Sequence, residues 1–268
     1  TAGVAFILCF LVCIALFFGS FVAMDVAIAL AIFLLIRSHL RYGKSSKTSV
    51  ADELFTKILH CSDRAECWTL LRRHVGYTTS QHLRQVSEDY EALTTAFFCE
   101  DYRVLKRTTL QTESQRKDIK RQRRKQIIAL RRIDPVLSVE KGTWYFLIIN
   151  SLSQMVYCLK RMGEPCREHV GNNFSPVPND YANEFLVIRN EIVHLFNRSL
   201  TIDNASQIRD DAAKLQSTLS IYRKRIIHDI QTKRLNIESM TVFLNLVQES
   251  QELLSALRHT LRGKSKFN

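Results

Sequence analysis

The chain opens with a long apolar stretch. Between Ala2 and Ile36 the apolar run is interrupted only by Gly3, Gly19, Ser20 and Asp25. One straight helix over this stretch would be about 50 Å long, whereas the hydrocarbon core of a membrane is about 30 Å thick. The pattern therefore predicts a transmembrane segment within residues 1–41.

Two arrangements of this segment fit the pattern. One is a hairpin of two helices, Ala2–Phe18 and Phe21–Leu40, that turns near Gly19 and Ser20. The other is a single tilted or kinked helix with Asp25 inside it. The hairpin places Asp25 near an interface, and we favour it because a carboxylate at the membrane centre is costly.

A basic cluster follows the apolar stretch. It consists of Arg37, Arg41, Lys44 and Lys47, and no acidic residue occurs before Asp52. Loops rich in Lys and Arg stay on the cytoplasmic side of a membrane, so we expect these four residues at the interface and residues 42–268 in the cytoplasm. A signal peptide is not favoured, because its positive charge precedes its apolar core. Residues 42–48 (YGKSSKT) are predicted to form a linker.

From residue 49 onward apolar positions recur every three or four residues, which is typical of helices with one buried face. The first predicted helix covers 49–98, with a break near Ser62 and Asp63. The others cover 102–132, 138–171, a range starting at Asn179 or Asp180, a range starting at Asp203 or Asn204, and a range from Asn236 that Gly263 ends. Residues 172–178 separate three long helices from three more. The chain has few prolines and no stretch in which apolar and polar residues alternate as in a strand. The prediction for residues 49–268 is therefore all-α.

The helix over 102–132 is unusually polar. Between Arg107 and Gln126 only Leu110 and Ile119 are strongly apolar. A helix of this kind buries little apolar surface. We therefore expect it to project from the bundle or to lie against a charged partner.

The net charge of +12 is concentrated in that helix. Seven basic residues occur within ten positions, against the single acid Asp118: Arg116, Lys117, Lys120, Arg121, Arg123, Arg124 and Lys125. Such a run is either a solvated face or a contact for anionic membrane lipid or another partner. Nucleic-acid binding is disfavoured, because neither an aromatic platform nor a groove-reading motif accompanies the charge.

No pattern in the sequence predicts an enzyme, a metal site or a cofactor. The seven cysteines form no CxxC pair, so free thiols are expected. The eight histidines form neither HxxxH nor HExxH, and we expect them at the surface. Cys166 and His169 are close in sequence, but neighbours on one helix rarely form a nucleophile–base pair.

Four segments carry a resemblance to a known family. They are 34–40 (LLIRSHL), 90–93 (YEAL), 97–106 (FFCEDYRVLK) and 166–173 (CREHVGNN), and the last predicted helix, from Asn236, adds to the resemblance. In this order they resemble the C-terminal region of bacterial inorganic phosphate transporters of the PiT family that carry a PhoU-like helical domain. The resemblance implies symport of inorganic phosphate with a coupling cation across the inner membrane, in a multi-pass protein of which this chain is the last part. It further implies a regulatory cytoplasmic bundle of about six antiparallel helices, built from two three-helix repeats. The sequence leaves the oligomeric state open, a homo-oligomer included.

Two features depart from that family. The Gly-Ala-Asn-Asp type signature of the transport helices does not occur, so the phosphate and cation sites are expected upstream of this chain. The carboxylate pairs that hold metal in PhoU proteins are missing too, since Glu88, Glu191 and Asp210 are followed four residues later by non-acidic residues. The alternative function is a membrane-tethered helical scaffold or signalling adaptor without transport activity.

Overall fold

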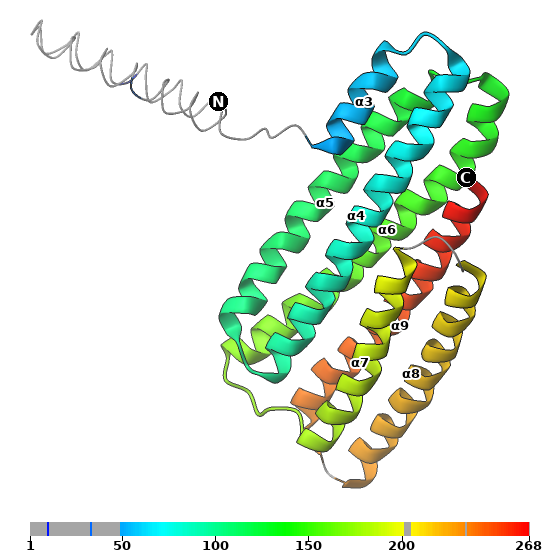
Figure 1. Cartoon of the computed structure of the whole chain (residues 1–268). Helices are drawn as coiled ribbons and strands as arrows, with labels where there is room; N and C mark the ends of the chain where they lie inside the picture. The colour runs from blue at the N-terminus through cyan, green and yellow to red at the C-terminus, as the bar shows by residue number, and fades with distance from the viewer. Residues whose placement is uncertain (1–9, 11–32, 34–48, 201–204, 234, 268) are drawn as a thin grey trace, which may run out of the picture. The chain divides into compact units, whose positions relative to one another are not determined.

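The computed structural model describes residues 10, 33, 49–200, 205–233 and 235–267, and every regular element among them is an α-helix. The chain divides into two compact units, Thr1–Val50 and Ala51–Asn268. The second unit is a bundle of long helices (Figure 1). Its elements are α3 (Val50–His60), α4 (Arg64–Phe98), α5 (Tyr102–Leu130), α6 (Pro135–Gly171), α7 (Asn179–Ser199), α8 (Ala205–Lys233) and α9 (Ile237–Phe267). The all-α class is thus confirmed for the described ranges.

The predictions for the N-terminal part fall almost wholly outside the described residues. Apart from Phe10 and Phe33, this applies to the transmembrane segment, to the linker 42–48 and to the basic residues Arg37, Arg41, Lys44 and Lys47. Within the described ranges, no helix has both the length and the apolar character needed to cross a membrane. The transmembrane segment stays a prediction.

Side-chain caps explain most of the helix starts. The carboxylate of Asp63 accepts hydrogen bonds from the backbone N–H groups of Ala65 and Glu66, which confirms the predicted break near Ser62 and Asp63. Asp101 caps α5 in the same way. Asp134 caps α6, and Pro135 follows at the first helical position, where its missing N–H costs nothing. The Asp134–Pro135 pair therefore begins α6, three residues before the predicted start at 138, whereas α5 already ends at Leu130.

Two further predicted boundaries are wrong. Neither Asn179 nor Asp180 caps α7, since the residue before the first turn is Pro178 and no side chain caps the helix. Gly263 does not end the last helix, which continues to Phe267. Gly263 instead allows α9 to approach α6 closely, because a Cβ at this position would lie 2.7 Å from Cγ1 of Ile148 and 3.2 Å from the backbone oxygen of Trp144.

This close approach predicts opposite effects for two glycines in helices. A Cβ added to Gly76 of α4 would meet no atom within 4 Å. We expect Gly76→Ala to stabilise the bundle by about 1 kcal/mol, since alanine is the better helix former. Gly263→Ala should instead destabilise it by about 1–2 kcal/mol through overpacking against α6. Urea unfolding of both variants measures the difference, and equal effects would contradict the tight α6–α9 contact.

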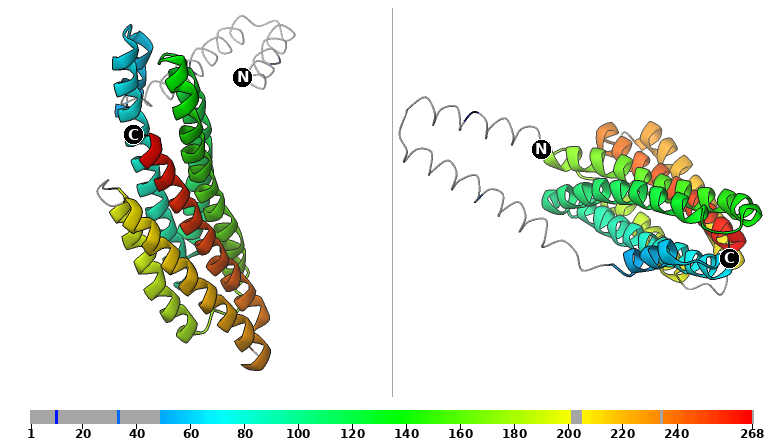
Figure 2. Two further views of the ribbon diagram at one scale, coloured as in Figure 1. Left: turned by 90° about the vertical axis from the view of Figure 1, so that its right-hand side faces the viewer. Right: turned by 90° about the horizontal axis from the view of Figure 1, so that it is seen from above.

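The long helices form two groups of three. Residues 172–178 connect α4, α5 and α6 to α7, α8 and α9 (Figures 1 and 2). The groups meet through α6 against α9, which is the most extensive contact between any two described helices, and through α4 against α7. The first helices of the two groups are therefore paired, and so are the third helices.

An aromatic cluster fills the core where the two groups meet. The ring of Phe243 on α9 lies 5.6 Å from that of Phe185 on α7, 6.0 Å from that of Phe98 on α4 and 6.1 Å from that of Tyr222 on α8. All three contacts are edge-on, which is a favoured geometry for aromatic pairs. Phe185 and Phe243 are fully buried. The cluster therefore ties four helices from both groups together.

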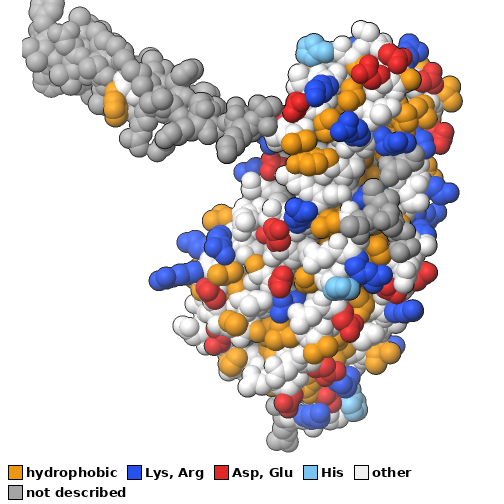
Figure 3. Space-filling view, in the orientation of Figure 1, with side chains coloured by type: hydrophobic (Ala, Val, Ile, Leu, Met, Phe, Trp, Pro, Cys, Tyr) orange, Lys and Arg blue, Asp and Glu red, His pale blue; other side chains and the backbone are white. Residues whose placement is uncertain are grey.

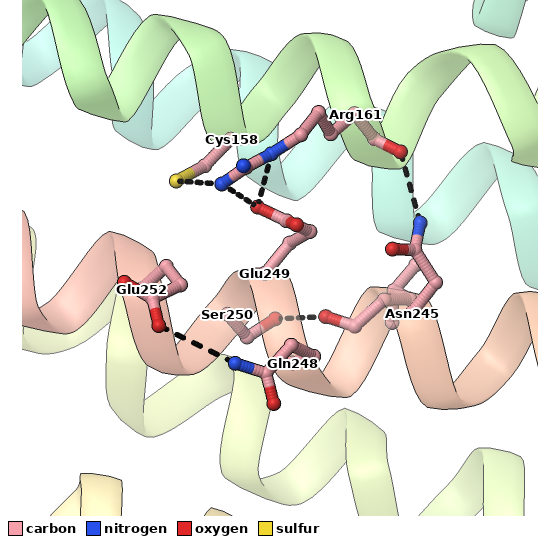
Figure 4. Close-up of polar contacts among 8 residues, drawn as sticks. Cys158, Arg161, Asn245, Gln248, Glu249, Ser250 and Glu252 are labelled. Carbon is pink, nitrogen blue, oxygen red and sulfur yellow. Dashed lines mark hydrogen bonds and ion pairs between the residues drawn. The ribbon is translucent and has the colours of Figure 1, made fainter.

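Polar contacts fix α6 against α9 (Figure 4). The Arg161 guanidinium donates from Nε and Nη2 to one carboxylate oxygen of the buried Glu249, at 3.0 and 2.7 Å. The side-chain amide of Asn245 donates to the backbone oxygen of Arg161 at 2.9 Å. A buried charge is tolerated only when it is paired and hydrogen-bonded, so this pair favours one register of the two helices.

The polar helix α5 does not project from the bundle, so the first of its two predicted placements is wrong. It packs along α4 and α6 and buries a face made mostly of small or polar residues: Leu105, Thr108, Thr112, Gln115, Ile119, Gln126, Ala129 and Leu130. Thr108 and Thr112 donate their hydroxyls to the backbone oxygens of Val104 and Thr108. Because these polar groups are hydrogen-bonded, they can be buried without a large penalty.

Candidate functional site

The basic run of α5 is spread around the helix. In the space-filling view, Lys and Arg side chains project from the edge of the bundle that α5 forms (Figure 3). Lys125 points to α3, where it pairs with Asp52 and lies 5.3 Å from the ring centre of Phe55. Arg121 pairs with Asp118 on its own helix at 2.9 Å. Lys125 thus helps to attach α3, while Lys117 and Arg124 are exposed.

The other three residues of the run line a groove between α5 and α6. Arg116, Lys120 and Arg123 lie on one face of α5, since they are spaced four and three residues apart. The facing wall is a stripe of α6 with the same helical spacing: Asn150, Ser153, Gln154 and Tyr157. Ile119 and Val156 form the apolar floor. The groove has a volume of about 360 Å³, within the range of small-molecule sites.

Charge in this groove is of one sign. None of the described residues that line it is acidic. Arg116 is partly compensated, because it pairs with Glu113 one turn earlier at 2.7 Å. Lys120 and Arg123 form no ion pair with any described acid, and the guanidinium of Arg123 lies 5.8 Å from the ring centre of Phe146. The groove therefore suits an anion.

A larger groove between α7 and α8 has mixed charge. Its volume is about 530 Å³, and its lining includes Glu191, His194, Arg198, Asp211 and Lys214. Arg198 pairs with Asp211 across the two helices at 3.0 Å. The charges compensate one another, so this groove has no clear preference for an anion or a cation.

Two of the described histidines are buried, which corrects the prediction that all lie at the surface. His74 is fully buried beside Phe55, and burial together with the nearby Lys125 lowers its pKa. His169 is also buried, and its Nε2 lies 3.1 Å from the backbone oxygen of Ser175 in the loop after α6. Both side chains lie on the buried faces of their helices. The sequence did not indicate this burial, because histidine is a polar residue.

The cysteines show no catalytic arrangement among the described residues. The five that are described are free thiols: Cys61, Cys67, Cys99, Cys158 and Cys166. Cys166 lies in the hydrophobic core, where burial raises the pKa of its thiol far above the ordinary value. A buried neutral thiol is a poor nucleophile. Within the described ranges, no three His, Cys, Asp or Glu side chains cluster in a way that suits a metal ion.

Sequence reasoning missed one buried carboxyl group between α4 and α5. Asp89 is only 3% exposed. Its carboxylate accepts hydrogen bonds from Nε2 of Gln115 at 2.5 Å and from Nε2 of Gln85 at 3.2 Å. Burial raises the pKa of Asp89 to about 6, and the two hydrogen bonds oppose this effect only in part. The polar α4–α5 contact therefore contains a group that titrates near neutral pH.

Comparison with known proteins gave no match: no protein-family model fits the chain, and neither a curated protein nor a solved structure is significantly similar to it. The structure itself defines the class, an all-helical bundle in the described residues with a basic groove between α5 and α6.

Proposed function

We propose that this chain is the C-terminal part of an inorganic phosphate transporter of the PiT family. In this proposal residues 49–268 form a PhoU-like regulatory domain in the cytoplasm of a bacterium, next to the inner membrane. Inorganic phosphate and the coupling cation bind to the upstream part of the transporter. The resemblance of the four segments described above motivates the assignment.

The observation that carries this proposal is the pairing of the two helix groups. The first helix of one group contacts the first helix of the other, α4 against α7, and the third contacts the third, α6 against α9. Two copies of one three-helix unit related by an approximate twofold axis would make such contacts, because the same surface of each copy meets at the axis. This arrangement supports a domain of two three-helix repeats, as the resemblance implies.

The basic residues suit a domain that works beside a membrane. A Lys or Arg close to anionic lipid gains about 1 kcal/mol. Exposed positions of the run, such as Lys117 and Arg124, are candidates for this contact, and Arg37, Arg41, Lys44 and Lys47 are the candidates near the membrane segment. Movement of the bundle would then reach the transport helices through residues 36–49.

Phosphate uptake by the full-length transporter tests the proposal. Cells that lack other phosphate importers would express either the full-length protein or a version without residues 49–268. We expect uptake in both, with loss of its response to phosphate supply in the truncated version. Quantification of each protein in the membrane fraction controls for expression. Absence of uptake from well-expressed full-length protein would overturn the proposal in favour of a tethered scaffold.

A further inference from the structure

We propose that the groove between α5 and α6 binds a soluble ligand with two or more linked phosphate groups, such as the polyphosphate part of a nucleotide. The binding does not depend on the proposed transport role. It is inferred from the charge, the spacing and the two-walled shape of this groove.

The spacing of the cations favours linked phosphates over a single one. Arg116 and Arg123 are seven residues apart on α5, which corresponds to about 10 Å along the helix, and Lys120 lies between them. A single phosphate ion would contact Arg116 and Arg123 together only if both long side chains bent toward it. A chain of phosphate groups that lies along α5 can contact all three side chains, and charge-assisted hydrogen bonds of this kind are the strong ones.

The α6 wall adds neutral hydrogen-bond donors. The amides of Asn150 and Gln154 are exposed on the same side as the phenol of Tyr157. The Ser153 hydroxyl donates to the backbone oxygen of Ile149 at 2.8 Å, so the two amides and the Tyr157 phenol are the donors that remain for a ligand. Since α5 and α6 are consecutive and run antiparallel, their stripes face each other along the whole groove (Figure 1).

A second basic patch on α5 provides a comparison. Arg103, Lys106 and Arg107 lie near the start of the helix, beside Leu110, Gln111 and Ser114. All six residues belong to α5, so no second helix forms a wall there. This patch matches the groove in charge and residue type but not in shape. It therefore separates binding in the groove from general attraction to a basic helix.

A membrane surface is the less favoured occupant of the groove. Flat anionic lipid would contact the outward-projecting Lys117 and Arg124 at least as well as the groove residues. The groove instead offers a cleft of about 360 Å³ with a floor of Ile119 and Val156, which a narrow ligand can enter. Binding of these basic residues to lipid headgroups is one of the outcomes that the test below distinguishes.

Calorimetric titration of the full 268-residue chain in neutral detergent micelles tests the proposal. The probes are tripolyphosphate, pyrophosphate, orthophosphate and sulfate at an ionic strength of about 0.15 M. We expect tripolyphosphate to bind at least about tenfold more tightly than orthophosphate or sulfate. The groove triple variant Arg116→Gln/Lys120→Gln/Arg123→Gln should lose at least about tenfold in affinity. The matched triple variant Arg103→Gln/Lys106→Gln/Arg107→Gln should stay within about twofold of the parent chain.

A second pair of variants changes one charge and leaves the basic residues in place. Gln154→Glu puts a carboxylate into the groove and should weaken tripolyphosphate binding by at least about tenfold. Gln111→Glu puts the same group beside the comparison patch and should change binding by less than about twofold. Circular dichroism checks that all four variants keep the helical content of the parent.

Three results would overturn the proposal. The first is no measurable binding of tripolyphosphate to the parent chain. The second is an equal loss of affinity in the two triple variants, which indicates general charge attraction. The third is binding confined to nanodiscs that contain phosphatidylglycerol, with no effect of added tripolyphosphate, which would assign the basic residues to lipid headgroups.

Discussion

Replacing Phe243 by alanine is expected to destabilise the bundle by about 3–5 kcal/mol, the largest effect predicted for a single substitution in this chain. The side chain is fully buried. It contacts aromatic rings on α4, α7 and α8, so its removal would leave a cavity where the two helix groups meet. Folded domains are stable by only about 5–15 kcal/mol, so this loss would weaken or abolish cooperative unfolding.

Urea unfolding of the full chain in neutral detergent, followed by circular dichroism, measures this effect. Ile221→Ala is the matched control, because Ile221 of α8 is 71% exposed and its truncation removes little buried area. We expect a change within about 0.5 kcal/mol for this control. Similar midpoints for the two variants would show that the aromatic cluster does not hold the groups together.

Replacing Asp89 by asparagine is expected to change how the stability of the bundle depends on pH. The folded-state pKa of Asp89 is about 6, raised from 3.8 by burial. The folded chain therefore binds the proton more tightly than the unfolded chain, and the ionised carboxylate destabilises the fold increasingly as pH rises from about 4 to 7. The asparagine side chain carries no charge, so the variant should gain stability relative to the parent over this range, by about 3 kcal/mol.

The difference in unfolding free energy between parent and variant, measured at several pH values, isolates this group from the other carboxylates. The expected curve is flat below about pH 4, rises between about pH 4 and 7 and then levels off. Glu168→Gln on the exposed face of α6 is the control, for which we expect no such rise. A difference that stays constant over this range of pH would contradict the assignment of a buried, titrating Asp89.

Local signals in the sequence were sufficient to place most of the helices. The break before α4 was predicted from Ser62 and Asp63, and the structure shows Asp63 as the cap. The ends of α4 at Phe98 and of α6 at Gly171, and the start of α9 after Asn236, agree with the predicted positions. These features depend on residues within one turn of each other, so an isolated segment already contains the information.

Contacts between distant segments explain the errors. The burial of α5 was missed because half of its inward face is Thr and Gln, which become favourable only next to specific partners. Gln115 meets Asp89, and Gln126 donates to Thr78 at 3.2 Å. Gly263 was predicted to end the last helix, although it lies where α9 approaches α6 closely. The spacing of residues within one helix does not reveal which residues of the other helices they contact.

The candidate site also combines one property that the sequence determines with another that depends on the tertiary structure. The sequence by itself determined that residues 116–125 form a strongly basic helical segment, because charge and helical periodicity are local properties. Only the tertiary structure decided which of these side chains act together. Packing against α3 uses Lys125, whereas packing against α6 places Arg116, Lys120 and Arg123 along one groove. A helix has several faces, and the neighbour that covers each face is set by the fold of the whole bundle.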